Sequence, residues 1–238
     1  MSEHSGRTVD WSALRTRDAA RPAPDTESLR ERKKRLTRRQ LSDTATQMFL
    51  ERGFDAVRVS EIAEACGVSE KTAFNYFPTK ESLILDRWEG TSSALREALA
   101  DPAAAPVQAA LRVLSRELDA LIRWLGAEDD FAHAVAQFQR FGALLHSTPS
   151  LRAHQLAATE RLTAEAAETL AARAGARPHD PEPLVAANAL IGLWHVQARS
   201  LSARLAEADS PQRLARAVTA DVDRAARVIE HGLAGWGG

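Results

Sequence analysis

The chain has 238 residues, a formal net charge of -1 and one cysteine, Cys66. At about 150 residues per domain this length allows one large domain or two small ones, and it can bury a core without disulfides or a structural metal. Ala and Leu far outnumber the β-branched residues Val and Ile, which favours helices and excludes an all-β fold. A single cysteine excludes an intramolecular disulfide and a multi-cysteine zinc site, and it agrees with a reducing cytosol.

The sequence shows no candidate membrane span and no secretory signal. No uncharged apolar run approaches the roughly 20 residues that cross a bilayer. Residues 1–30 carry acidic side chains and lack the apolar stretch of a signal peptide. We therefore expect a soluble, cytoplasmic protein with no membrane partner.

The charged residues are distributed unevenly. Residues 1–27 hold 4 basic and 5 acidic side chains, residues 28–87 hold 12 and 9, and residues 88–238 hold 15 and 18. Within the middle block, residues 30–40 contain seven basic side chains and Glu31 as the one acidic residue. Such a density of positive charge attracts a polyanion. A solvated helix end or a disordered arm without a partner would have the same composition.

The first part of the chain is expected to form a tail followed by three helices. Residues 1–27 lack a sustained apolar period and contain Pro22 and Pro24, so we interpret them as a flexible tail. Apolar spacing, caps and glycines predict the helices that follow, which are 37–53, a short one capped by Ser60 and ending near Gly67, and 70–77 capped by Ser69. Two short helices joined by a glycine-containing turn are typical of a helix-turn-helix, whose second helix enters a DNA major groove.

Six longer helices are expected after Pro78. They are a fourth helix capped by Thr79 and continuing past Gly90, a fifth over 107–125, a sixth capped by Asp129, a seventh over 151–174, an eighth over 183–205, and a ninth capped by Ser210 with Pro211 at its first position. The sequence therefore predicts an all-α protein. A tail of residues 1–27 precedes a three-helix DNA-binding domain over 28–87, and a six-helix domain spans 88–238.

The segment from Val59 to Leu83, VSEIAEACGVSEKTAFNYFPTKESL, resembles the TetR family of bacterial transcriptional regulators. The linked motifs are Glu51-Arg52-Gly53-Phe54, Gly67-Val68-Ser69 and Phe77-Pro78-Thr79-Lys80-Glu81, and the resemblance covers roughly residues 37–85. It implies a homodimer on a near-palindromic, double-stranded DNA operator, which a small-molecule effector bound to the C-terminal domain would release. The C-terminal part is similar to the family in its six-helix architecture alone.

The solvent-facing first turn of the third helix is the expected base-reading element. Glu70, Lys71 and Thr72 lie there, with side chains long enough to reach base edges, and Lys71 is suited to guanine O6 and N7. The residues expected at the DNA backbone are Ser60, Phe74, Asn75, Tyr76, Lys80 and Arg38. Of these, Tyr76 and Lys80 match phosphate-binding positions of the family.

Two features near this element leave alternatives open. Phe74 lacks a hydroxyl for a phosphate, so it packs either on sugars and thymine methyl groups or in the core, whereas Phe77 and Cys66 are expected in the core. The basic run over residues 30–39 either adds salt-dependent, sequence-independent affinity, for example through the adjacent minor groove, or stays solvated without a partner.

Polar residues on the expected inward faces of the C-terminal helices are candidates for an effector site. The predicted pocket consists of Trp88, Arg123, Trp124, His133, Gln137, Phe138, Phe141, Trp194 and His195. Each polar member by itself is equally consistent with a satisfied core or interface group. The last two helices carry the long apolar surfaces left for pairing, and the predicted dimer interface consists of Leu201, Leu205, Leu214, Val218, Val222 and Ile229.

The sequence offers little support for an enzyme. Glu128-Asp129-Asp130 is similar to a paired-acid magnesium motif of all-α prenyl-diphosphate enzymes, but acids at a helix start are explained by capping and the helix dipole. No metalloprotease, hydrolase or phosphate-loop motif occurs, so we expect no catalytic residues, no metal and no cofactor. The predicted function is a ligand-released repressor. The alternative is a dimeric DNA-binding protein without ligand control, and an all-α enzyme is a distant third.

Overall fold

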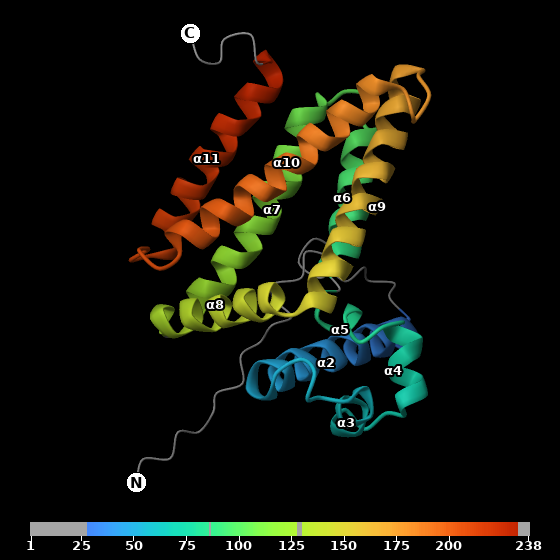
Figure 1. Ribbon diagram of the computed structural model, residues 1–238, viewed down its shortest axis with the longest axis vertical. Helices are drawn as coiled ribbons and strands as arrows, with labels where there is room; N and C mark the ends of the chain where they lie inside the picture. The colour runs from blue at the N-terminus through green and yellow to red at the C-terminus, as the bar shows by residue number, and fades with distance from the viewer. Residues whose placement is uncertain (1–27, 86, 128–129, 233–238) are drawn as a thin grey trace.

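The computed structural model describes residues 28–85, 87–127 and 130–232 (Figure 1). This part of the chain is helical and contains no strand, which confirms the predicted all-α fold with an N-terminal helix-turn-helix. Its helices are α2 (Leu29–Arg52), α3 (Val59–Ala65), α4 (Glu70–Tyr76), α5 (Ser82–Leu85), α6 (Arg87–Ala100), α7 (Pro106–Ala127), α8 (Phe131–Ser147), α9 (Pro149–Ala174), α10 (Pro181–Arg204) and α11 (Pro211–His231). The predicted tail of residues 1–27 lies outside the described residues.

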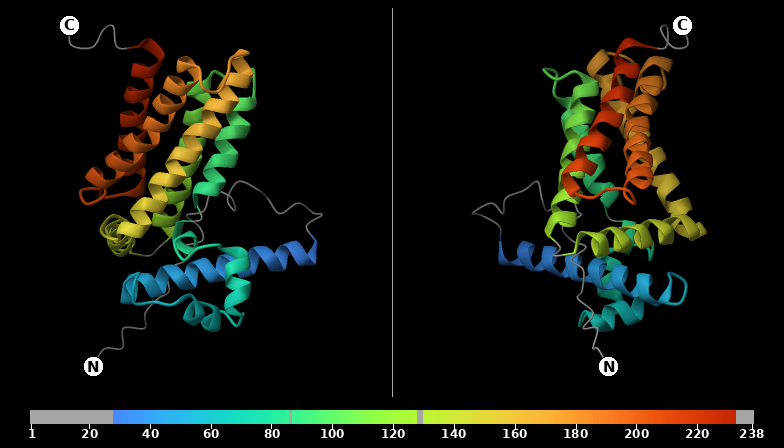
Figure 2. Two further views of the ribbon diagram at one scale, coloured as in Figure 1. Left: turned by 45° about the vertical axis from the view of Figure 1, so that its right-hand side comes forward. Right: turned by 90° about the vertical axis from the view of Figure 1, so that its left-hand side faces the viewer.

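Helices α2 to α5, which the sequence predicts to bind DNA and which we call the DNA-binding unit, share one hydrophobic cluster with the helices that follow. Helix α2 lies across α3 and α4, as the views in Figures 1 and 2 agree. Gly67 joins α3 to α4 with a φ of 67°, a left-handed conformation that favours glycine. The largest fully buried side chains of the unit are Leu41, Phe49, Ile62 and Phe77. The expectation that Phe77 belongs to the core is confirmed.

Helix α2 begins two turns earlier than predicted. Ser28 caps it, because its hydroxyl accepts a hydrogen bond from the Glu31 backbone N–H at 3.2 Å while the Glu31 carboxylate accepts from the Ser28 N–H at 3.1 Å. This reciprocal capping box satisfies two backbone donors. The predicted start at Thr37 is therefore wrong, and the basic run is part of a 24-residue helix, not a disordered arm.

The predicted fourth helix is divided into α5 and α6. Residue 86 between them and the side chain of Trp88 lie outside the described parts of the structure. The predicted N-cap Asp129 also lies outside them, and Asp130 caps α8 by accepting a hydrogen bond from the His133 N–H at 3.1 Å. The start of α11 is as predicted, with Ser210 as N-cap and Pro211 at the first position.

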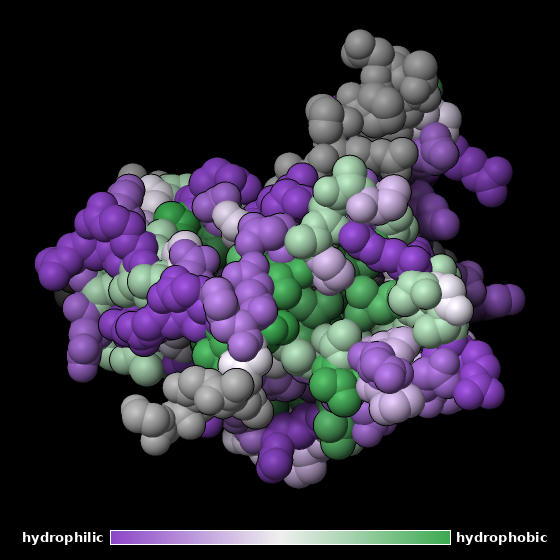
Figure 3. Space-filling model, turned by 90° about the horizontal axis from the view of Figure 1, so that it is seen from above, coloured by the Kyte–Doolittle hydropathy of each residue, from purple (hydrophilic) through white to green (hydrophobic). Residues whose placement is uncertain are grey.

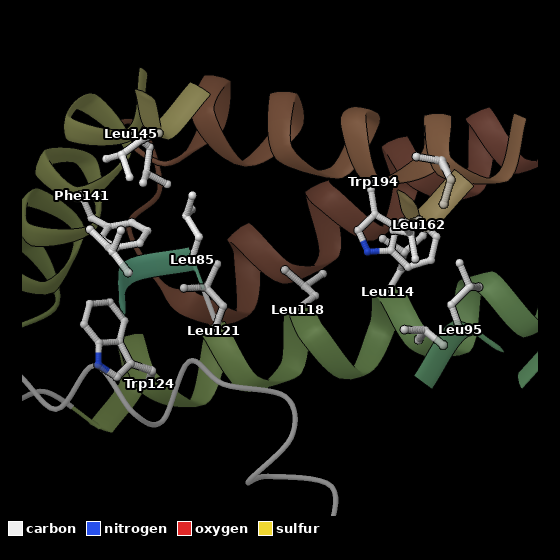
Figure 4. Packing of buried hydrophobic residues seen from close by; sticks show 14 of the residues in the cluster. Leu85, Leu95, Leu114, Leu118, Leu121, Trp124, Phe141, Leu145, Leu162 and Trp194 are labelled. Atoms are coloured by element: carbon white, nitrogen blue, oxygen red, sulfur yellow. The ribbon is translucent and has the colours of Figure 1, made fainter. Parts of the chain in front are cut away.

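Helices α6, α7, α9, α10 and α11 run roughly side by side as a bundle, and α8 crosses the end of the bundle that faces α2 (Figure 2). Apolar side chains of α7 line the interior from Leu114 through Leu118 and Leu121 to Trp124, and Trp194 of α10 lies near Leu114 (Figure 4). Arg173 of α9 donates to the carbonyl of Asp101, at 3.0 Å, beyond the end of α6. Among the described helices, none combines the length and apolarity needed to cross a membrane.

Candidate nucleic-acid interface

The first turn of α4 projects into solvent from a well-fixed helix start. Ser69 is the N-cap, and its hydroxyl accepts a hydrogen bond from the Thr72 N–H at 3.1 Å. The side chains of Glu70 and Lys71 are exposed. Thr72 is half-buried, and its hydroxyl lies 2.8 Å from that of Ser69. The exposed functional groups of this turn are therefore the carboxylate of Glu70 and the ammonium group of Lys71.

The remainder of α4 alternates between the core and solvent. Ala73 is fully buried, whereas Phe74 is 42% exposed and Asn75 is also exposed. Of the two environments left open for Phe74, the core is thus excluded in this chain. Tyr76 is half-buried at the end of the helix, where its ring packs against the core.

Lys80 is held inside the DNA-binding unit, which the sequence prediction missed. Its ammonium group donates a hydrogen bond to the Phe54 carbonyl at 2.5 Å and lies 4.4 Å from the centre of the Phe54 ring and 5.6 Å from that of Phe49. Burial lowers the pKa of Lys80 below its ordinary value. Lys80 ties the segment after α4 to the loop after α2, and its contact with the DNA backbone stays a prediction.

Arg38 has a similar place on the other side of α4. Its guanidinium donates to the Tyr76 carbonyl at 3.0 Å and lies 4.7 Å from the centre of the Phe77 ring. The last turn of a helix leaves carbonyl groups without helical partners, and a cation there is favourable. Arg38 therefore fixes the C-terminal end of α4 against α2, and its contact with DNA phosphate stays a prediction.

Ser60 is exposed but is not the cap of α3. The cap position is Arg58, whose backbone N–H donates to the Glu61 carboxylate at 2.7 Å. Glu61 also pairs with Arg52 at 2.9 Å, and these two interactions, the backbone one foremost, lower the pKa of Glu61. The sequence prediction of Ser60 as the cap is wrong because Glu61 satisfies the start of the helix. Ser60 remains on the surface near this helix start.

The predicted effector residues divide into interior and surface groups. Trp124, Phe141 and Trp194 are buried. Phe138 is half-buried and lies with its ring centre 6.3 Å from that of Trp124 and 6.4 Å from that of Phe141. Solvent-exposed members of the predicted set are Arg123, His133 and His195, while Gln137 is half-buried and lies 3.4 Å from the His133 ring nitrogen. For the exposed three, the predicted place in an interior pocket is wrong.

A buried carboxylate in the bundle was missed. Glu117 of α7 is 8% exposed, and it accepts hydrogen bonds from the Trp194 indole N–H at 2.9 Å and from the Thr91 hydroxyl. The signal was weak because Glu117 stands in a helix that also carries exposed charged residues. Its position in step with Leu114, Leu118 and Leu121 on the apolar face was the available clue.

The predicted dimer residues pack mostly within one chain. Leu205, Leu214, Val218 and Val222 are each at most 4% exposed, because the apolar stripe of α11 packs against α10 and α7 of the same molecule. Leu201 and Ile229 are half-buried. The assignment of the four buried residues to a subunit interface is therefore wrong, since the fold of the single chain already covers them.

No cluster of three or more metal-ligating side chains occurs in the part of the chain that the structure describes. A family model described as "Bacterial regulatory proteins, tetR family" matches residues 41–86, which span the end of α2 through α5. The match coincides with the DNA-binding unit described above.

Similar proteins extend this match beyond the DNA-binding unit. The HTH-type transcriptional regulator TcmR of Streptomyces glaucescens is 32% identical over 163 residues, which are 66% of this chain and 69% of that protein. The HTH-type transcriptional regulator BetI of Rhizobium meliloti is 37% identical over 97 residues, which are 41% of this chain and 45% of that protein. A crystal structure of a tetR-family transcriptional regulator from Streptomyces coelicolor is 20% identical, covering 84% of this chain and 83% of that one with a TM-score of 0.42. By its match to TcmR and to the family model, the chain belongs to the tetR family of bacterial regulatory proteins and is a DNA-binding transcriptional regulator, not an enzyme.

Proposed function

We propose that the protein is a homodimeric repressor that binds a near-palindromic operator through the first turn of α4 and leaves it when a small molecule binds the C-terminal bundle. The observation that carries the proposal is the exposed pair Glu70 and Lys71 on a short helix fixed at both ends, by Ser69 at its start and by Arg38 at its end. A rigid helix presenting long polar side chains is what major-groove recognition requires.

Within this interface the residues have different roles. Lys71 donates to guanine O6 and N7, and Glu70 accepts from a cytosine amino group. Ser60, Phe74, Asn75 and Tyr76 lie beside the DNA backbone, where the exposed Phe74 ring contacts sugars or thymine methyl groups. Arg38 and Lys80 act from inside the domain by holding the two ends of the helix-turn-helix in register.

Dimerisation is proposed through the outer face of α10. Val185, Ala189, Gly192 and Val196 follow one another at spacings of four, three and four residues, and Val185 is 68% exposed. A Cβ atom at Gly192 would meet nothing within 4 Å. Glycine inside a helix costs about 1 kcal/mol relative to alanine. The absence of a side chain at Gly192 would let a second α10 approach closely, which explains a glycine at this position.

The surface near the start of α10 agrees with this proposal. Leu184, next to Val185, is 38% exposed. Figure 3 views the end of the molecule farthest from α3 and α4 and shows apolar residues gathered there between hydrophilic side chains. Contiguous apolar surface with a polar rim is typical of an interface.

Effector control is proposed to reach the DNA-binding unit through α8. Arg140 of α8 donates a hydrogen bond at 3.1 Å to the carbonyl of Leu50 in the last turn of α2. The opposite side of α8 carries Phe138 and Phe141 beside Trp124 of the bundle. A molecule that displaces these aromatic rings shifts α8 and with it the contact to α2.

The experiment is fluorescence anisotropy with DNA from the region upstream of the protein's own gene, compared with scrambled DNA at two salt concentrations. Sequence-selective binding by a dimer supports the proposal, and a chemical screen then seeks molecules that abolish the signal. If binding is selective and no molecule in the screen alters it, the result favours a DNA-binding protein without ligand control. Binding that is equal on both DNAs contradicts the proposed operator recognition.

A further inference from the structure

The N-terminal two turns of α2 project beyond the helix-turn-helix as a charged rod. Arg38 is the point where α2 touches the end of α4, through its hydrogen bond to the Tyr76 carbonyl. The nine residues before it, at 1.5 Å each, extend the helix by about 13 Å. Their side chains are exposed or half-exposed. The left view of Figure 2 shows this end of α2 extending past α4.

Four cations on this extension have no ion-pair partner among the described residues, namely Arg30, Arg32, Lys33 and Lys34. The nearest acid, Glu31, is engaged in the capping box with Ser28. Four positive charges within about 6 Å of helix length repel one another, and such an arrangement is unfavourable for an isolated helix. A counter-charge outside the chain removes that repulsion.

Two of these cations, Arg30 and Lys34, lie on the same side of α2 as its buried residues. Arg30, Lys34 and Arg38 follow at intervals of four residues and therefore lie in line on one side of α2. Further along, Leu41 and Ala45 on this side are fully buried against the DNA-binding unit. The side of α2 that is buried against the DNA-binding unit at Leu41 and Ala45 thus continues past the end of α4, where it carries Arg30 and Lys34.

We infer that Arg30 and Lys34 bind backbone phosphates of duplex DNA flanking the sequence that α4 contacts, and that the helical form of the extension places them there. The inference rests on the proposed operator binding and adds a second, sequence-independent contact to it. One charge of double-stranded DNA occurs for every 1.7 Å or so of its axis, so a rod of about 13 Å adjoining the end of α4 reaches phosphates beyond the contacted bases.

The opposite side of the extension has a different character. Leu29 is 84% exposed and Leu36 is 48% exposed, and Arg32 lies on their side of the helix. A basic helix with an apolar side also binds anionic membranes. We favour DNA because the face aligned with the helix-turn-helix carries Arg30 and Lys34 and no large apolar side chain.

The test measures anisotropy on a random-sequence duplex of about 40 base pairs, roughly four helical turns, as a function of salt. The variant Arg30→Gln/Lys34→Gln is expected to flatten the slope of log affinity against log salt by about 1.8 per protomer, and by about 3.6 for the dimer. A rise from 50 to 200 mM salt then weakens binding of the variant dimer about 150-fold less than that of the wild type. Arg32→Gln is the matched control on the other side of the helix and is expected to leave the slope unchanged.

A second variant tests the helical placement. Leu36→Pro keeps every charge but interrupts α2 ahead of Arg38, and it is expected to flatten the slope as the double substitution does. A wild-type slope for Leu36→Pro would show that a flexible arm suffices and would overturn the placement. An unchanged slope in the double variant, or equal losses with Arg32→Gln, would overturn the phosphate contacts.

The outcomes also separate this inference from the proposed function. If the wild type prefers its operator to scrambled DNA while the double variant keeps the wild-type slope, the inference alone fails. If the wild type shows no preference for any DNA, the proposed function fails. Vesicles of phosphatidylglycerol and phosphatidylcholine provide the remaining comparison. The extension would be assigned to a membrane if the wild type binds these vesicles, if Leu29→Ser/Leu36→Ser abolishes that binding, and if the salt slope on DNA is the same in this variant as in the wild type.

Discussion

Replacing Arg38 by alanine separates a residue that positions α4 from one that contacts DNA. The guanidinium donates to the Tyr76 carbonyl at 3.0 Å and lies 4.7 Å from the Phe77 ring centre. A charged hydrogen bond contributes about 1.5–3 kcal/mol, and a cation above an aromatic ring contributes about 0.5–2 kcal/mol. Because Arg38 is only partly buried, which weakens both contributions, we expect Arg38→Ala to lower the free energy of unfolding by about 1–4 kcal/mol.

The measurement is urea unfolding followed by circular dichroism, at one protein concentration because dimerisation shifts apparent stability. Arg32→Ala, an exposed arginine on the same helix, is the control and is expected to change stability by less than about 0.5 kcal/mol. Arg38→Lys keeps the charge but loses the planar donor fork, so it should recover part of the loss. Wild-type stability in Arg38→Ala together with a DNA salt slope reduced by about 1.8 for the dimer would refute the positioning role.

Three further predictions follow from other parts of the structure. Lys71→Ala is expected to reduce discrimination between operator and scrambled DNA by about 1–3 kcal/mol, and an equal loss on both DNAs would contradict a base contact. Val185→Asp is expected to shift the protein toward monomer in sedimentation, since it buries a charge against a second α10; an intact dimer would exclude this face. The hydrogen bond from Ser200 and, after it, those from Arg204 lower the pKa of Asp221. The stability that Asp221 contributes is therefore present above its unfolded pKa of about 3.9 and is lost as the pH falls through its lower folded pKa. In urea unfolding, the wild type should be more stable than Asp221→Asn, and this difference should shrink below about pH 4.

The helix-turn-helix and most helix starts could be predicted because their signals are local. Ser69 and Ser210 cap the helices that follow them, and Gly67 makes the turn, as their spacing indicated. The same rules applied to Ser28 and Glu31, which form a capping box three residues apart. That start was missed because the apolar spacing that marks the helix begins at Leu41, which placed the predicted start at Thr37.

Contacts between distant segments could not be predicted in the same way. Lys80 matches a pattern associated with phosphate, yet its partner is the Phe54 carbonyl, 26 residues away. The apolar stripe of α11 is equally suited to a partner chain or to α10 and α7 of its own, and periodicity does not distinguish the two. Val218 is 0% exposed in the single chain. Its packing against helices of its own chain could therefore be recognised only from the fold.

Helix α2 has a mechanical consequence because it is unbroken from Leu29 to Arg52. Its basic end and the Leu50 carbonyl that Arg140 holds are joined by twenty residues of one rod, about 30 Å. Arg38 braces this rod near its middle, against the end of α4. A displacement of α2 at Leu50 is therefore carried along one continuous helix to Arg38 and Arg30.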